Sequence, residues 1–337
     1  MKQALIVITL LLLTVICASA WWLWNDMQTV LNSPLPNNTA VDFTIEAGMS
    51  LQSISNKLRE SGLIRQPYYL VFEARRTRKE GKLKAGEYVI NPGTTPRQLL
   101  DLFTSGKVKQ YAITLIEGWT FAQMMETIGN DSVLTHTLDP ADRPSLMNAI
   151  GRPGISPEGQ FFPDTYHFPR GASDLDFLRR ACDAMHKILS EEWEQRAENL
   201  PYKTPYEALI MASLVEKESG LKDERAEIAG VFVRRLQKGM KLQTDPTVIY
   251  AMGNNFDGNL RREDLSIDSP YNTYVFAGLP PTPIALPGRE SIHAALHPAD
   301  NNSLYFVAKG DGSHQFSETL DEHNKAVTRY QLDRQAQ

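Results

Sequence analysis

The chain has 337 residues and a formal net charge of -5, with acidic and basic side chains interspersed along it. This length allows two domains, or one large domain with an accessory module. The lack of a basic stripe excludes a nucleic-acid-binding class, and the two cysteines, one of them Cys17 inside an apolar run, argue against an internal disulfide.

The first predicted element is an apolar helix at the N-terminus. Residues 4–24 contain no charged side chain, and a helix of this length is about 30 Å long, the thickness of a bilayer's hydrocarbon core. Lys2 precedes the run, and three tryptophans near its end suit a headgroup interface. We expect a transmembrane anchor over residues 1–25 and a proline-containing tether over residues 26–41, with the remaining chain facing outward.

Two other interpretations of the apolar run stay open. Ala18-Ser19-Ala20 fits the small-residue rule of a cleaved signal peptide, although the apolar character continues beyond it. A lipoprotein signal is less favoured, because Ile16 before Cys17 is large and branched. All three interpretations export the chain.

A strand, a glycine, a hydroxyl residue and an amphipathic helix then recur in the same order. The three units cover residues 43–58, 88–103 and 113–128. Each glycine supplies a turn, and each hydroxyl residue can cap the helix that follows; the turn and cap pairs are Gly48 and Ser50, Gly93 and Thr95, and Gly118 and Thr120. The pattern predicts a small α+β module over residues 42–108.

The first unit, IEAGMSLQSISNKL, resembles the start of a LysM carbohydrate-binding repeat. The resemblance implies a LysM-like module. The segment YYLVFEARRTRKEGKLKAGEY departs from the length usual in that family, and a module that only supports the fold remains the alternative to one that binds glycan.

A larger mixed α+β domain is predicted over residues 109–337. Apolar residues recur at helical spacing over residues 175–189, and residues 304–308 are typical of a strand. Between such elements lie loops rich in proline and aromatic residues, at 158–171 and 269–288. Loops of this kind, held between regular elements, favour a binding groove.

The most informative helix of this domain ends in two glutamates. Thr204, Pro205 and Glu207 form a strong helix start, and the following residues are apolar almost all round. At the other end, Glu216 and Glu218 are about 200° apart on the helix. Burial and the helix terminus would raise the pKa of Glu218 above about 4.3, so this residue could protonate a leaving group. The alternative is a surface acid at a charged helix end.

Five segments carry a resemblance to one enzyme family. Glu218-Ser219 after an apolar helix resembles the Glu-Ser signature of lysozyme-like lytic transglycosylases. In their order and spacing, the segments resemble the YceG-like family of endolytic murein transglycosylases, and the likeness runs from the anchor to Asn324; the segments are 158–166, 214–220, 242–250, 269–284 and 305–324.

The resemblance implies cleavage within peptidoglycan, between N-acetylmuramic acid and N-acetylglucosamine. Glu218 would be the catalytic acid and then the base, and the muramic acid's own 6-hydroxyl would close onto C1 to leave a 1,6-anhydro end. We therefore expect an inner-membrane protein with its bulk in the periplasm, acting on glycan strands and associated with peptidoglycan synthases. We expect no cofactor.

Further site residues are predicted from their chemistry. Amide, hydroxyl and aromatic groups suit sugar rings and acetamido groups, and the candidates are Ser219, Gln243, Tyr271, Asn272 and Tyr274. Asp164 and Asp245 follow or precede prolines, and turn or capping roles are favoured for both. If either lies opposite Glu218, two-carboxylate hydrolysis becomes the alternative.

Other chemistries have little support. His293 and His297 are four residues apart, but the glutamate of a zincin motif is absent and no third ligand is evident, so no metal is predicted. The GDGSH stretch at residues 310–314 is interpreted as a turn, and no GxSxG motif occurs. The alternative to an enzyme is a membrane-anchored scaffold that binds peptidoglycan without cutting it.

Overall fold

The computed structural model describes residues 2–218 and 220–332. It is a mixed α and β protein in which the strands form three two-stranded sheets within the described residues. The chain divides into two compact units: the first contains residues 1–111 and 168–171, and the second contains residues 112–167 and 172–337. The predicted boundary at 108/109 lies three residues before the first crossing.

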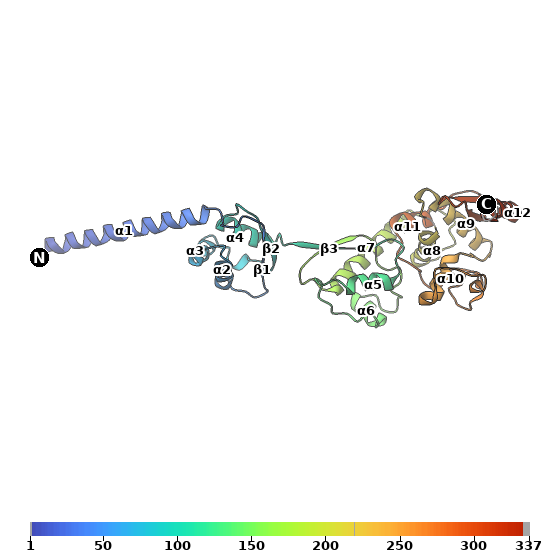
Figure 1. Cartoon of the computed structure of the whole chain (residues 1–337), viewed down its shortest axis with the longest axis horizontal. Helices are drawn as coiled ribbons and strands as arrows, with labels where there is room; N and C mark the ends of the chain where they lie inside the picture. Colours follow the sequence, from blue (N-terminus) through green and yellow to red (C-terminus); the bar gives the residue numbers. More distant parts are fainter. Residues whose placement is uncertain (1, 219, 333–337) are drawn as a thin grey trace. The chain divides into compact units, whose positions relative to one another are not determined.

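The first unit begins with the long apolar helix α1 (Lys2–Asn32), labelled in Figure 1. Its side chains from Leu5 to Trp24 are exposed, and the helix is long and apolar enough to cross a membrane. Both features are consistent with the predicted single-pass anchor.

The predicted tether is wrong in its first part, because α1 continues seven residues past the expected end of the anchor. Met27 and Leu31 are buried against Tyr69, and the Tyr69 hydroxyl donates to Asp26 Oδ2 at 2.6 Å. Beyond the helix, Leu35 is buried in the core of the unit. Apolar packing therefore fixes most of this segment on the module instead of leaving it free.

The module itself is built on an antiparallel pair, β1 (Val41–Ile45) with β2 (Gly86–Ile90), in the register Val41↔Ile90. Helices α2 (Leu51–Glu60), α3 (Pro67–Arg76) and α4 (Pro96–Ser105) gather around this pair (Figure 1). Their apolar faces close a core with Tyr88 and Phe103 at its centre.

The repeated strand–turn–helix units are present as predicted. The three glycines have φ of 82°, 82° and 77°, the left-handed conformation that glycine adopts most easily. Ser50, Thr95 and Thr120 cap their helices as predicted, and the last two do so in capping boxes with Gln98 and Gln123. The third strand–turn–helix repeat runs through β3 (Gln110–Thr114) into α5 (Phe121–Gly129).

The second unit is mainly helical. Strand β3 pairs with β4 (Thr165–Pro169), a strand inside a segment predicted to be a loop, and β5 (Tyr305–Ala308) forms a hairpin with β6 (His314–Ser317). The helices are α5, α6 (Arg143–Ile150), α7 (Asp174–Glu194), α8 (Pro205–Glu218), α9 (Arg225–Gln237), α10 (Asp245–Met252), α11 (Arg289–Leu296) and α12 (Leu320–Val327). Helix α8 lies at the centre and packs against α7, α9, α10 and α11.

Candidate active site

Helix α8 carries the predicted acid to the edge of the core. The Thr204 hydroxyl accepts from the Glu207 amide at 3.3 Å, and Pro205 occupies the first helical position, as predicted. Residues 208–215 are all buried. A helix fixed on every side has little freedom to move, so the side chains of its last turn are held in place.

The two glutamates of that turn have different surroundings. Glu216 forms an ion pair with Arg225 at 3.1 Å, and its other carboxylate oxygen accepts from the Gly288 amide at 3.0 Å. Only 5% of the Glu216 side chain is exposed. Glu216 therefore connects elements of the fold, and it does so as a buried ion pair, not as a solvent-facing acid.

Glu218 points elsewhere and is half-buried. Its Oε2 accepts a hydrogen bond of 2.7 Å from the Thr244 hydroxyl. Burial raises the pKa of Glu218 to about 7, since removal from water disfavours the carboxylate; the nearby charge of Asp245 raises it further, while the Thr244 hydrogen bond, His314 and Arg235 oppose the rise. A substantial fraction of Glu218 is thus protonated at neutral pH.

Glu218 lies in the wall of a cavity of about 450 Å³. Side chains from α8, α9, the start of α10, the hairpin β5–β6 and α12 surround it. Arg235, Gln243, Asp245, Tyr274 and His314 share this wall. Segments more than one hundred residues apart in the sequence therefore meet around one carboxyl group.

Two basic side chains of this wall are held firmly. Arg235 is 8% exposed, and its guanidinium donates to the carbonyls of Leu242 and Leu304, both at 2.7 Å. His314 Nδ1 lies 2.8 Å from Glu224 Oε2. Arg235 and His314 thus line the same cavity as the acid with their side chains held in place, and such fixed polar groups suit a polar ligand.

Two of the predicted sugar-contacting residues share the cavity with Glu218. Gln243 is exposed and has a φ of 53°, in the left-handed region that few residues other than glycine adopt. Backbone strain of this kind often marks a functional position. The Tyr274 hydroxyl donates to Asp245 Oδ1 at 2.6 Å.

The other predicted contacts are placed differently. Asn272 is fully buried and donates to the carbonyls of Leu265 and Ile267, so it organises its loop and its amide does not face the cavity. The Tyr271 hydroxyl pairs with Thr282 Oγ1 at 3.0 Å, and its ring packs against Tyr250. Neither residue lines the cavity of Glu218. Ser219 lies outside the described residues.

The two candidate second acids also differ in their position relative to the cavity. Asp164 is exposed, accepts from the Thr165 amide at 2.7 Å and does not line the cavity. Asp245 does line it, at the first residue of α10. The residue in the N-cap position of α10 is Thr244, whose hydroxyl is used by Glu218 and does not cap the helix.

Sequence reasoning missed three members of the site. Thr244 is part of a segment singled out only for its family resemblance, Arg235 is one of several charged residues on α9, and His314 was assigned to a turn. The turn is correct, with Gly310 and Gly312 at positive φ. The only available signal was that a histidine follows it, at the start of β6.

Known proteins resemble this chain over most of its length. A family model described as the YceG-like family matches residues 43–329. A Bacillus subtilis (strain 168) protein named endolytic murein transglycosylase is 33% identical, over 87% of this chain and 86% of its own.

A Streptococcus pneumoniae (serotype 2, strain D39) protein of the same name is 27% identical, over 97% of this chain and 65% of its own. The crystal structure of a putative yceG-like protein from Listeria monocytogenes superposes with a TM-score of 0.54 and 31% identity, covering 86% of this chain and 99% of that one.

Proposed function

Because the chain belongs to the YceG-like family, we propose that it is a lytic transglycosylase that cuts within peptidoglycan glycan strands. The relatives named endolytic murein transglycosylase support this activity. The observation in the structure that supports it best is Glu218, a carboxyl group with a pKa of about 7 in the wall of a cavity that Arg235, Gln243 and Tyr274 also line.

The proposed reaction needs one acid. Protonated Glu218 gives its proton to the glycosidic oxygen between N-acetylmuramic acid and N-acetylglucosamine, and the bond from that oxygen to C1 breaks. The muramic acid's 6-hydroxyl oxygen bonds to C1, and its proton passes to the Glu218 carboxylate. The products are a free 4-hydroxyl and a 1,6-anhydro end, no water is consumed, and the acid is regenerated.

Hydrolysis with Asp245 as second carboxylate is the alternative for the same cavity. An inverting hydrolase needs a carboxylate that activates water, and a retaining one needs a carboxylate nucleophile. Asp245 Oδ1 accepts the Tyr274 hydroxyl, which favours an electrostatic role. Its negative charge raises the pKa of Glu218 and so helps to keep the acid protonated.

We assign sugar contacts to Gln243 and Tyr274, the predicted candidates that line the cavity. Arg235 and His314 add donors for acetamido or hydroxyl oxygens. Tyr271 and Asn272 are proposed to position the loop that carries Tyr274 and not to touch the sugar. Asn272 Oδ1 accepts the Tyr274 amide at 2.9 Å. Ser219 remains a proposed contact on the family resemblance alone.

The anchor and the module complete the proposal. Helix α1 would hold the protein in the inner membrane with residues 112–337 in the periplasm, where newly made strands are near the membrane. The module at residues 42–108 is proposed to be LysM-like, which the strand, turn and capped helix of its first unit support. An association with peptidoglycan synthases rests on the family resemblance.

The product of the reaction tests the proposal directly. Purified glycan strands incubated with the full chain in detergent should give internal fragments with 1,6-anhydro ends, measured by mass spectrometry. Reducing ends would instead indicate hydrolysis and return attention to Asp245. Strands that are bound and never cut would support the scaffold.

The pH dependence of cutting should follow Glu218. The active acid is the protonated form, so kcat/KM should be highest below pH 7 and should fall as the pH rises through about 7. Thr244 donates to the ionised form and lowers the pKa. Thr244→Val should therefore move the alkaline limb to higher pH.

Thr244→Ser, which keeps the hydroxyl, is the matched control and should leave the limb in place. Because the Thr244 side chain makes no cap bond to α10, the valine variant does not remove a helix cap. A limb that stays fixed in Thr244→Val, or moves to lower pH, would contradict the assignment of Glu218 as the acid.

A further inference from the structure

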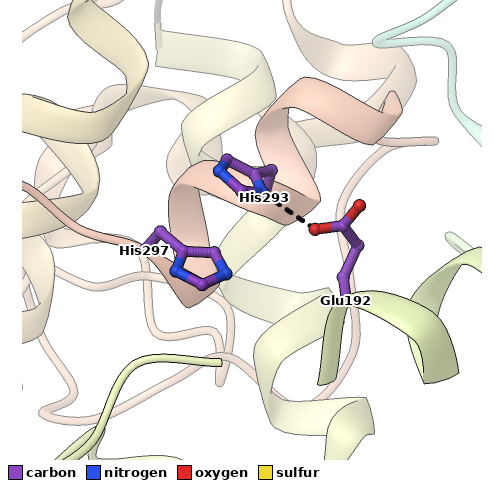
Figure 2. Close-up of side chains that lie close together, drawn as sticks. All are labelled: Glu192, His293 and His297. Atoms are coloured by element: carbon purple, nitrogen blue, oxygen red, sulfur yellow. Dashed lines mark hydrogen bonds and ion pairs between the residues drawn. The ribbon is translucent and has the colours of Figure 1, made fainter. Parts of the chain in front are cut away.

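A second group of side chains lies outside the cavity of Glu218. Glu192 on α7, His293 on α11 and His297, which follows α11, converge as shown in Figure 2. We call these three residues the His-Glu cluster. The sequence showed the histidine pair without a third ligand; the fold corrects this, because α7 brings Glu192 from about one hundred residues earlier in the chain.

The cluster has the donor set of a zinc site. One carboxylate oxygen and one nitrogen from each imidazole lie within 4.8 Å of one another. Glu192 Oε2 is already 2.8 Å from His293 Nδ1. Ligands around a tetrahedral zinc ion are about 3.3 Å apart, given zinc–ligand distances of about 2.0–2.1 Å. The separations in the cluster are therefore within about 1.5 Å of those that a tetrahedral ion requires.

The Glu192 carboxylate is held in a position that suits a metal ligand. Glu192 is buried, and its Oε1 accepts from Arg289 Nε at 2.8 Å, which leaves Oε2 directed at the histidines. Arg289 thus orients the ligand from behind, as outer partners do in metal sites.

The histidines are equally suited. Their rings stack with centroids 4.3 Å apart, so two protonated rings would repel each other. A cavity of about 620 Å³ has Glu192 and His293 in its wall, so two of the three donors are reached from solvent.

We propose that the His-Glu cluster is a binding site for a divalent transition-metal ion, with Zn²⁺ as the best match to two imidazoles and one carboxylate. The metal takes the place of the proton between Glu192 and His293. It ties α7 to α11, and α11 packs on α8. The site therefore stabilises the helices that hold Glu218, and none of its ligands lines the catalytic cavity.

Metal binding to the full chain in detergent tests this proposal. After dialysis against micromolar Zn²⁺ and then against metal-free buffer, elemental analysis should find one zinc per wild-type chain. His297→Ala and the double variant His293→Ala/His297→Ala should retain none, and Glu192→Gln should bind about tenfold or more weakly. Cobalt added to the wild type should give the visible absorption of a tetrahedral site.

His167→Ala removes an exposed histidine of another segment and is the matched control, expected to keep one zinc. Zinc should also raise the Tm of the wild type and of His167→Ala, but not that of His297→Ala. The proposal is overturned if the wild type retains no zinc, or if the double variant retains as much as the wild type. Neither result depends on cleavage of peptidoglycan.

Discussion

Replacing Glu218 with glutamine is expected to abolish strand cleavage while the protein stays folded. The amide cannot give up a proton to the glycosidic oxygen, and loss of a positioned general acid costs about 10²- to 10⁴-fold in rate. Its carbonyl oxygen can still accept the Thr244 hydrogen bond, so the surroundings are preserved. The measurement is the rate of 1,6-anhydro end formation, wild type beside Glu218→Gln.

The same substitution should make the folded protein more stable than the wild type at alkaline pH. In the folded state the pKa of Glu218 is raised to about 7, while the unfolded chain has the ordinary value of about 4.3. The stability that protonated Glu218 contributes is complete below the unfolded pKa and is lost as the pH rises through 7, up to about 4 kcal/mol. Glutamine does not ionise and avoids this loss.

The advantage of Glu218→Gln in Tm should therefore grow between pH 5.5 and pH 8.5. A variant that is inactive and also less stable than the wild type at pH 8.5 would argue for a structural role of the carboxylate. Cleavage at the wild-type rate would exclude Glu218 as the acid.

Sequence patterns predicted the parts of the structure that depend on neighbouring residues. The helix caps at Thr95 and Thr120 and the start of α8 are formed within four or five residues, so the local sequence determines them. The same holds for the left-handed glycine turns. Glu218 was found because the apolar run before it already implied a buried helix.

The other residues of the site are brought together by contacts between segments far apart in the sequence, which no local pattern indicates. Arg235 and His314 reach the cavity because α9 and the β5–β6 hairpin fold back onto α8. An asparagine in a loop has the same appearance in the sequence whether it faces a sugar or, as Asn272 does, two carbonyls of its own loop. The predicted tether failed for the same reason, because Tyr69 extends α1 by packing and not by propensity.

Replacing Glu216 with glutamine, two residues from the acid, is expected to lower stability and to leave the chemistry in place. The Glu216 and Arg225 side chains are 5% and 7% exposed. Breaking a buried ion pair costs about 3–5 kcal/mol, because one charge is left buried without its partner. Glu290 and Glu117 also approach Arg225, at 3.5 and 3.8 Å, so we expect about 2–3 kcal/mol.

For a unit of this size such a loss lowers Tm by about 5–10 °C, which thermal unfolding followed by circular dichroism measures. The control is Glu216→Gln combined with Arg225→Met, which removes both charges and should recover part of the loss. A Tm equal to that of the wild type would show that the ion pair adds nothing. If both glutamate variants behave as expected, the last turn of α8 has two separate functions. Glu216 holds the helix in the core, and Glu218, about 200° around the helix, performs the proton transfer.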